Sequence, residues 1–117
     1  MDARDLDRWQ EHGREHGYIR ARLRLLTTEQ GGRQGAIHSG YRSCWGFPLA
    51  LHADMHDGPL LIERREILDP GEVAIVCLHP LFPEFWPEVS EGLPLVMFEG
   101  SRKVGEAVVI EVVPPVR

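Results

Sequence analysis

The chain has 117 residues, 43% of them hydrophobic and 26% charged, which is an ordinary composition for a single globular domain. It carries 18 acidic residues against 13 basic ones, and this net charge of −5 disfavours a general nucleic-acid binder, because polyanion binding requires an excess of Lys and Arg. No apolar run approaches the roughly 20 residues that cross a bilayer, and the first residues are too charged for a signal peptide, so we expect a cytoplasmic protein without membrane contact.

Residues 1–17 predict an N-terminal extension, and within residues 2–16 Leu6 and Trp9 are the only large apolar side chains. The helical pattern is thin, so the extension is either a short helix packed on the rest of the chain or a frayed tail. Gly17 would cap such a helix at its C-terminus, because glycine adopts the left-handed conformation needed there.

Residues 18–27 predict a half-buried strand, because apolar and charged side chains alternate with a period of two. The arginines form either a solvated face or a basic ridge, since alternate residues fall in line on one face of a sheet. The first 43 residues carry eight arginines against six acidic residues, which leaves room for a local basic patch. The inward positions would be Ile19, Ala21, Leu23 and Leu25, and the outward ones Arg20, Arg22 and Arg24.

The remaining chain breaks into short strands separated by turns rich in Gly, Pro and Asp. Further strands are predicted over residues 37–51 (with interruptions), 60–68, 73–78, 95–98 and 104–113. Turns are predicted at 30–32, 57–59 and 69–71, and residues 99–102 give a tight connection between the last two strands. Many short strands without intervening helices indicate a small all-β sandwich or barrel, formed by one domain over residues 18–117.

Motifs for catalysis or cofactor binding are incomplete in this sequence. Residues 100–105 have the glycine spacing of a phosphate-binding loop, but Glu106 stands where lysine is needed and a strand follows. The HADMHD run at 52–57 lies between turn and strand signals, which favours a solvated loop over a metal site. Cys44 and Cys77 lie in apolar contexts and are interpreted as reduced, buried thiols. We therefore expect no catalytic residues, no cofactor and no metal.

Three motifs occur in order along residues 18–114: GGR at 31–33 with GYR at 40–42, Pro-Gly at 70–71 with LHP at 78–80, and EGSRKVG at 99–105. Together they resemble the third, C-terminal β-barrel domain of bacterial elongation factor Tu. The resemblance implies a closed six-stranded antiparallel barrel and no GTP binding by this chain. His79, in the second motif, is interpreted as a hydrogen-bonded structural histidine at a strand end.

In that factor the third domain helps to hold the T-stem of aminoacyl-tRNA, packs on the GTPase domain and meets the nucleotide-exchange factor. Two polar contact positions of the family are altered: Cys44 replaces a glutamine, and the family's threonine falls near Ala53. Arg33, Tyr41 and Arg42 are either structural or part of a contact face. The candidate contact residues for tRNA or a protein partner are Arg33, Tyr41, Arg42, Glu99, Gly100, Arg102 and Lys103.

Residues 81–91 form an insertion relative to the family and contain Phe82, Phe85 and Trp86 between prolines. Rigid aromatic rings lose little entropy on binding, so they could anchor a protein partner. Alternatively, Phe85 or Trp86 folds back and plugs an open barrel end.

Two functional hypotheses follow, and neither is an enzyme. In the first, the chain is a protein-interaction module associated with the translation machinery, as a mimic, decoy or regulator. In the second, it binds a tRNA stem through the backbone amides and Arg102 of the 99–102 loop and through the arginines of residues 18–27. The acidic net charge and the altered polar positions favour the first hypothesis, whereas the matching loops favour the second.

Overall fold

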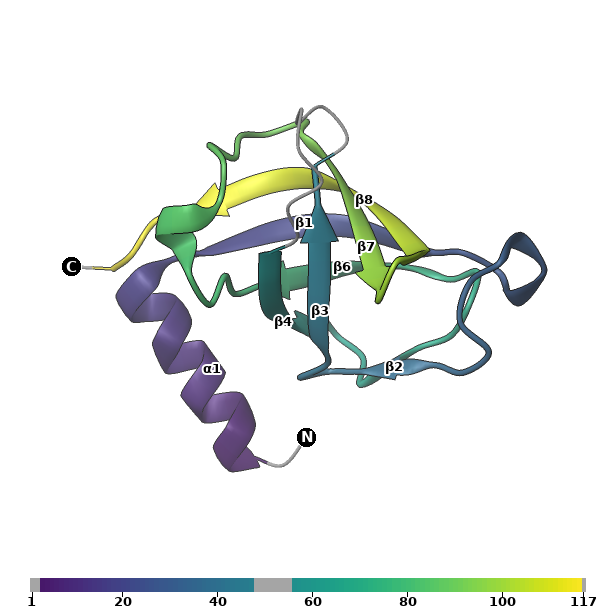
Figure 1. Cartoon of the computed structure of the whole chain (residues 1–117). Helices are drawn as coiled ribbons and strands as arrows, with labels where there is room; N and C mark the ends of the chain where they lie inside the picture. The colour runs from purple at the N-terminus through teal and green to yellow at the C-terminus, as the bar shows by residue number, and fades with distance from the viewer. Residues whose placement is uncertain (1–2, 48–55, 117) are drawn as a thin grey trace.

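The computed structural model describes residues 3–47 and 56–116, apart from the side chains of Ala3 and Phe85. The described residues form one α-helix, two 3-10 turns and eight strands (Figure 1). In chain order these are α1 (Ala3–His16), β1 (Tyr18–Leu25), η1 (Thr28–Gln30), β2 (Ile37–His38), β3 (Arg42–Gly46), β4 (His56–Ile62), β5 (Ile67–Leu68), β6 (Val73–Leu78), η2 (Pro83–Phe85), β7 (Pro94–Glu99) and β8 (Arg102–Val113).

Six strands close into a barrel in the order β1-β6-β4-β3-β7-β8, with every neighbouring pair antiparallel. The short strands β2 and β5 pair separately. The predicted fold class, an all-β closed six-stranded antiparallel barrel with a short N-terminal helix, is therefore confirmed. Closure removes the open sheet edges that otherwise invite aggregation.

The core lies inside the barrel and is built from the inward positions of its strands. The alternation predicted for residues 18–27 is confirmed, because the apolar side chains of β1 are buried while the arginines face outward. Trp45 is fully buried, and its indole Nε1 donates to Ser43 Oγ at 2.6 Å. The Ser43 hydroxyl in turn donates to the Gly58 carbonyl, so both buried polar groups are satisfied.

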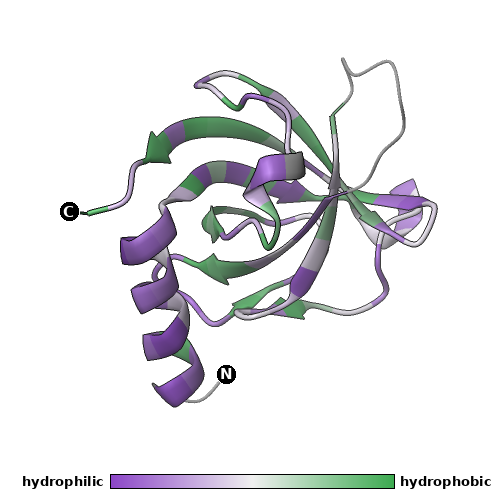
Figure 2. Cartoon of the chain, turned by 60° about the vertical axis from the view of Figure 1, so that its left-hand side comes forward, coloured by the Kyte–Doolittle hydropathy of each residue, from purple (hydrophilic) through white to green (hydrophobic). Residues whose placement is uncertain are grey.

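Helix α1 runs along the outside of the barrel, and its surface is mostly hydrophilic (Figure 2). Gly17 ends it with φ +79°, and its N–H donates to the Gly13 carbonyl at 2.8 Å, as the cap prediction requires. The Trp9 ring packs on His79, with 5.7 Å between centroids, so the extension is a docked helix and not a frayed tail. Among the described residues, no helix combines the length and apolarity that a membrane crossing needs.

Two predicted boundaries are wrong. Residues 57–59, predicted as a turn, lie within β4, where Gly58 lets the strand approach β6 closely: a Cβ there would lie 3.0 Å from the His79 carbonyl oxygen. Pro59 lacks an N–H, but its carbonyl accepts from the His79 N–H at 3.0 Å. The single strand predicted over 60–68 is split into β4 and β5 by a turn in which Arg64 has φ +65°.

The strand predicted over residues 37–51, with interruptions, is indeed interrupted within its described part. Gly40, with φ +93°, separates β2 from β3. The part of this prediction that covers residues 48–51 lies outside the described residues.

Candidate functional site

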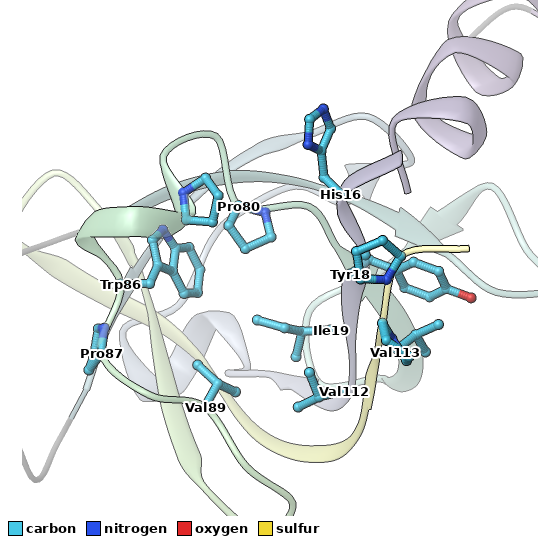
Figure 3. Close-up of a pocket in the computed structure, with 13 residues that line it drawn as sticks. His16, Tyr18, Ile19, Pro80, Trp86, Pro87, Val89, Val112 and Val113 are labelled. Atoms are coloured by element: carbon cyan, nitrogen blue, oxygen red, sulfur yellow. The ribbon is translucent and has the colours of Figure 1, made fainter. Parts of the chain in front are cut away.

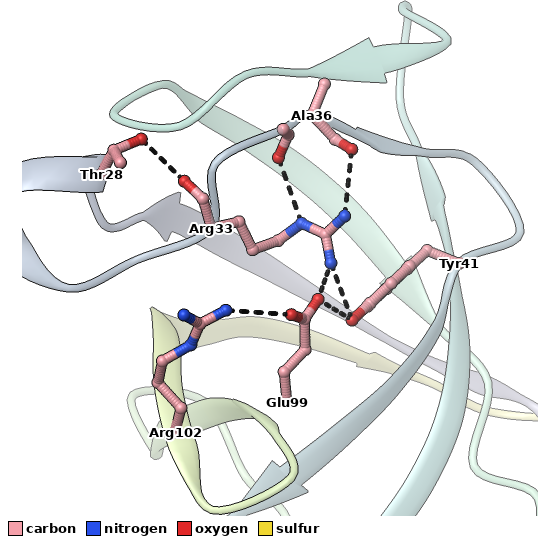
Figure 4. A network of polar contacts seen from close by, with 7 residues as sticks. Thr28, Arg33, Ala36, Tyr41, Glu99 and Arg102 are labelled. Carbon is pink, nitrogen blue, oxygen red and sulfur yellow. Dashed lines mark hydrogen bonds and ion pairs between the residues drawn. The ribbon is translucent and has the colours of Figure 1, made fainter.

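Glu99, at the end of β7, is the centre of a polar network that joins segments distant in sequence (Figure 4). Its carboxylate accepts from the Tyr41 hydroxyl at 2.6 Å and forms an ion pair with Arg33. Arg102 approaches the same carboxylate at 3.5 Å. Arg33 also donates to the Gly35 carbonyl at 3.1 Å, and its guanidinium lies 5.1 Å from the centre of the Tyr41 ring.

This network brings together Arg33, Tyr41, Glu99 and Arg102, four of the seven residues predicted to contact tRNA or a partner. The Arg33 and Glu99 side chains are only 23% and 27% exposed, so their charges mainly neutralise each other within the fold. Burial raises the pKa of Tyr41, an effect that the Arg33 cation opposes. The network therefore links the 31–41 loop to the end of β7 as a structural clamp.

The other three predicted contact residues lie around the network rather than in it. Gly100 occupies the adjacent turn with φ +60°. Lys103 pairs with Glu106 on β8 at 2.5 Å. Arg42 pairs with Asp57 on β4 at 3.3 Å, separate from Glu99.

The outward arginines of β1 are also mostly neutralised. Arg20 donates to Glu63 at 2.9 Å and to Glu111 at 3.3 Å. Arg24 donates to Glu106 at 3.1 Å. The hydrogen bond from Arg20 lowers the pKa of Glu63, as an ion pair should. The basic-ridge interpretation thus fails at both ends of the row, where each cation has its own carboxylate.

The aromatic insertion folds partly back onto the barrel. The Trp86 side chain packs against the core, and its ring meets Phe47 edge-on at 5.6 Å and His56 at 5.6 Å. Trp86 therefore acts as a plug as well as a surface group, whereas Phe82 is 56% exposed. The side chain of Phe85, the third predicted anchor, lies outside the described part of the chain.

An apolar groove of about 250 Å³ opens beside Trp86, where β1 begins and β8 ends. Figure 3 shows Ile19, Val89 and Val112 pointing into it. We call it the barrel-end groove; its lining residues are His16, Gly17, Tyr18, Ile19, Pro80, Pro83, Trp86, Pro87, Val89, Val112, Val113, Pro114 and Pro115. The wall formed by β8 was not predicted, although residues 107–113 carry apolar side chains at both parities, which indicates that both faces of this strand are in use.

His79 differs from the structural role predicted for it. It is 2% exposed, and neither ring nitrogen finds a hydrogen-bond partner among the described residues, so the predicted hydrogen-bonded histidine is wrong. Aromatic rings cover it instead, with Tyr18 at 5.5 Å and His12 at 5.9 Å between centroids. Burial, followed by the nearby His12, lowers its pKa to about 4.

A cleft of about 560 Å³ separates part of α1 from the barrel next to this histidine. Gly13 allows the helix to come close at one point, since a Cβ there would lie 3.0 Å from both the His79 Cε1 and the Tyr18 ring. Cys77 and Glu63 line the barrel side of the cleft. Burial and the adjacent Glu63 raise the pKa of the Cys77 thiol to about 11, which opposes formation of a reactive thiolate.

The remaining candidates are quickly placed. Both cysteines are free, and burial also raises the pKa of Cys44, with Asp57 adding to the effect. Within residues 3–47 and 56–116, no cluster of three or more His, Cys, Asp or Glu could hold a metal ion. Of the HADMHD run, His56 and Asp57 belong to β4, while residues 52–55, including Ala53, lie outside the described residues.

A scan of the chain against models of known protein families found no match. The described residues offer an apolar groove and a polar face whose charges are mostly paired.

Proposed function

We propose that the chain is a non-catalytic protein-interaction module that works with the translation machinery, as a mimic, decoy or regulator. The barrel-end groove is the observation that carries the proposal. Its walls combine Trp86, Tyr18 and several prolines, a rigid apolar lining of the kind that anchors protein partners. The association with translation rests on the resemblance of the three motifs to the third domain of elongation factor Tu.

Charge pairing supports a protein partner over a nucleic acid. A phosphate contact needs a cation that is free to replace a counterion. Arg33, Lys103 and Arg42 each already pair with a carboxylate of the chain, as do Arg20 and Arg24 of β1. Recruiting any of them to phosphate would first break an internal ion pair, which weakens the net gain.

A tRNA-stem-binding module is the second candidate, and the loop after β7 favours it. Gly100, Ser101 and Arg102 are exposed there, and the Arg102 side chain is 56% exposed with only a 3.5 Å contact to Glu99. This loop could present backbone amides and one guanidinium to a phosphate.

To test the proposal, the labelled chain is titrated with the purified protein components of a reconstituted bacterial translation system, one at a time. Val112→Glu places a charge on the exposed wall of the barrel-end groove, and Val116→Glu makes the same change at a residue outside it. We expect one component to bind, with an affinity that moderate salt hardly changes. Val112→Glu should abolish this binding and Val116→Glu should preserve it; binding by none of the components contradicts the proposal.

The second candidate is tested with bulk tRNA, charged and uncharged, at low and moderate salt. Phosphate contacts would give saturable binding that falls steeply with salt and disappears when Arg102 and Lys103 are replaced by glutamine. The protein-interaction proposal expects only weak binding, without dependence on those two residues.

A further inference from the structure

The three outward arginines of β1 differ in what lies beside them. In the sheet register, Arg20 lies opposite Glu111 and Arg24 opposite Glu106, and both pairs are bonded. Arg22 lies between them, opposite Val108 on β8 and Ile75 on β6. No carboxylate of the described residues pairs with Arg22, which is exposed.

The surface around Arg22 is aliphatic, although outward positions of such a barrel are normally polar. Val73 is 38% exposed, Val108 48% and Ile110 36%. Ile110 is the extra residue of a bulge that interrupts the pairing of β1 with β8, and the bulge adds its side chain to the outer face. We call Arg22, Val73, Ile75, Val108 and Ile110 the Arg22 face.

We propose that the Arg22 face is a second interaction surface, which docks an apolar segment of a partner protein that carries a carboxylate. Its composition is that of an interface hot spot: an arginine among aliphatic side chains, bordered by charges that satisfy one another. The ion pairs of Arg20 and Arg24 close the row at both ends, so Arg22 is the cation left for the partner. A carboxylate held against its guanidinium in an apolar setting forms a strong, charge-assisted hydrogen bond.

Two other occupants fit this face less well. A second copy docked by a two-fold axis through the face would bring two Arg22 side chains together, and like charges oppose each other across an apolar contact. An RNA strand would have to pass the carboxylates of Glu63, Glu106 and Glu111, which flank Arg22 on the neighbouring strands and loop. An apolar protein segment with a single carboxylate brings one negative charge, which Arg22 itself can hold, whereas an RNA strand brings one at every nucleotide.

The Arg22 face shares no residue with the barrel-end groove. The inference therefore stands independently of the proposed function, and either can fail alone. Val112→Glu reports on the groove, and a change at residue 22 reports on this face.

The test selects binders from a displayed library of random short peptides, in parallel on the native chain, on Arg22→Glu and on Arg8→Glu. Arg8 is a matched control, because its side chain is 73% exposed on α1, away from the barrel. We expect the native chain and Arg8→Glu to enrich peptides with Asp or Glu among large apolar residues. Arg22→Glu should instead enrich peptides with Lys or Arg, and exchange of the acid for lysine in a selected peptide should weaken its binding at least tenfold, about 1.4 kcal/mol.

The site of binding is read from backbone amide chemical shifts of the labelled chain. Shifts centred on Arg22, Ile75 and Val108 support the inference. It is overturned if acidic peptides are not enriched, if Arg22→Glu selects the same peptides, or if the shifts lie around Trp86. Displacement of the peptide by duplex RNA, with shifts on the same face, would also overturn it, because the occupant would then be nucleic acid.

Discussion

The buried imidazole of His79, which has no hydrogen-bond partner among the described residues, should make the stability of the protein depend on pH in a way that one substitution removes. In the folded chain its pKa is lowered from 6.5 to about 4, chiefly by burial. Between these values the unfolded chain binds a proton that the folded chain does not bind. The free energy of unfolding therefore keeps its full value above about pH 6.5, and the part that depends on His79 is lost as the pH falls toward 4.

The size of this loss follows from the shift. A lowering from 6.5 to about 4 corresponds to about 3 kcal/mol, since one pKa unit is worth about 1.4 kcal/mol. His79→Leu removes the titrating group and its two unsatisfied nitrogens while it keeps an apolar side chain under Gly13. At pH 7.5 we expect the variant to be as stable as the native chain or up to about 2 kcal/mol more stable, because no buried polar atom remains unpaired there.

The assay is urea unfolding followed by tryptophan fluorescence at several pH values from 7.5 to 4.5. Protonation of acidic groups lowers the stability of both proteins alike. The difference in free energy of unfolding between the native chain and the variant therefore isolates the effect of His79. That difference should grow in favour of His79→Leu by about 2 kcal/mol or more over this range. His38→Gln, at an exposed histidine in β2, controls for the loss of a histidine as such. Parallel curves for the native chain and His79→Leu would refute the reasoning.

Three further changes test other parts of the structure. Glu99→Gln should destabilise the fold by about 1–2 kcal/mol, because it leaves the half-buried Arg33 without its ion pair. The same change should raise the affinity for tRNA at low salt in a filter-binding assay. Unchanged stability would show that the network is not a clamp. Trp86→Ala should cost about 2 kcal/mol and leave the circular dichroism spectrum native, while it weakens binding of the partner in the groove; complete unfolding would mean that the tryptophan is only a plug. Cys77, whose pKa is raised from 9.0 to about 11, should react with iodoacetamide at pH 8 about 100-fold more slowly than an ordinary thiol. Mass spectrometry of the labelled peptide measures this rate. Equal rates would show that burial and Glu63 do not raise the pKa of this thiol.

The barrel was predictable where local pattern and tertiary environment agree. In β1 every second residue is buried, so the period of two was visible in the sequence alone. At residues 57–59 the same reasoning failed, because Gly58 and Pro59 carry turn signals but serve a close approach of β4 to β6. Local residue preferences cannot reveal a contact between strands so far apart in sequence.

The candidate site shows the same division. The motifs placed Arg33, Tyr41 and Glu99 among the candidates, and the structure joins them, but as partners of one another. The isolation of Arg22 depends on which residues face it across two strands, and the missing hydrogen bonds of His79 depend on where α1 docks. Both are matters of register and packing, which a single sequence does not specify.

We propose that this barrel acts on translation by binding a protein through its barrel-end groove. The most direct measurement adds increasing amounts of the chain to a reconstituted bacterial translation reaction and follows the rate of peptide synthesis. We predict a dose-dependent change of rate with the native chain and with Val116→Glu, and none with Val112→Glu, whose charge occupies the groove wall. An unchanged rate with the native chain, or equal effects of all three proteins, would show that the barrel-end groove has no such role.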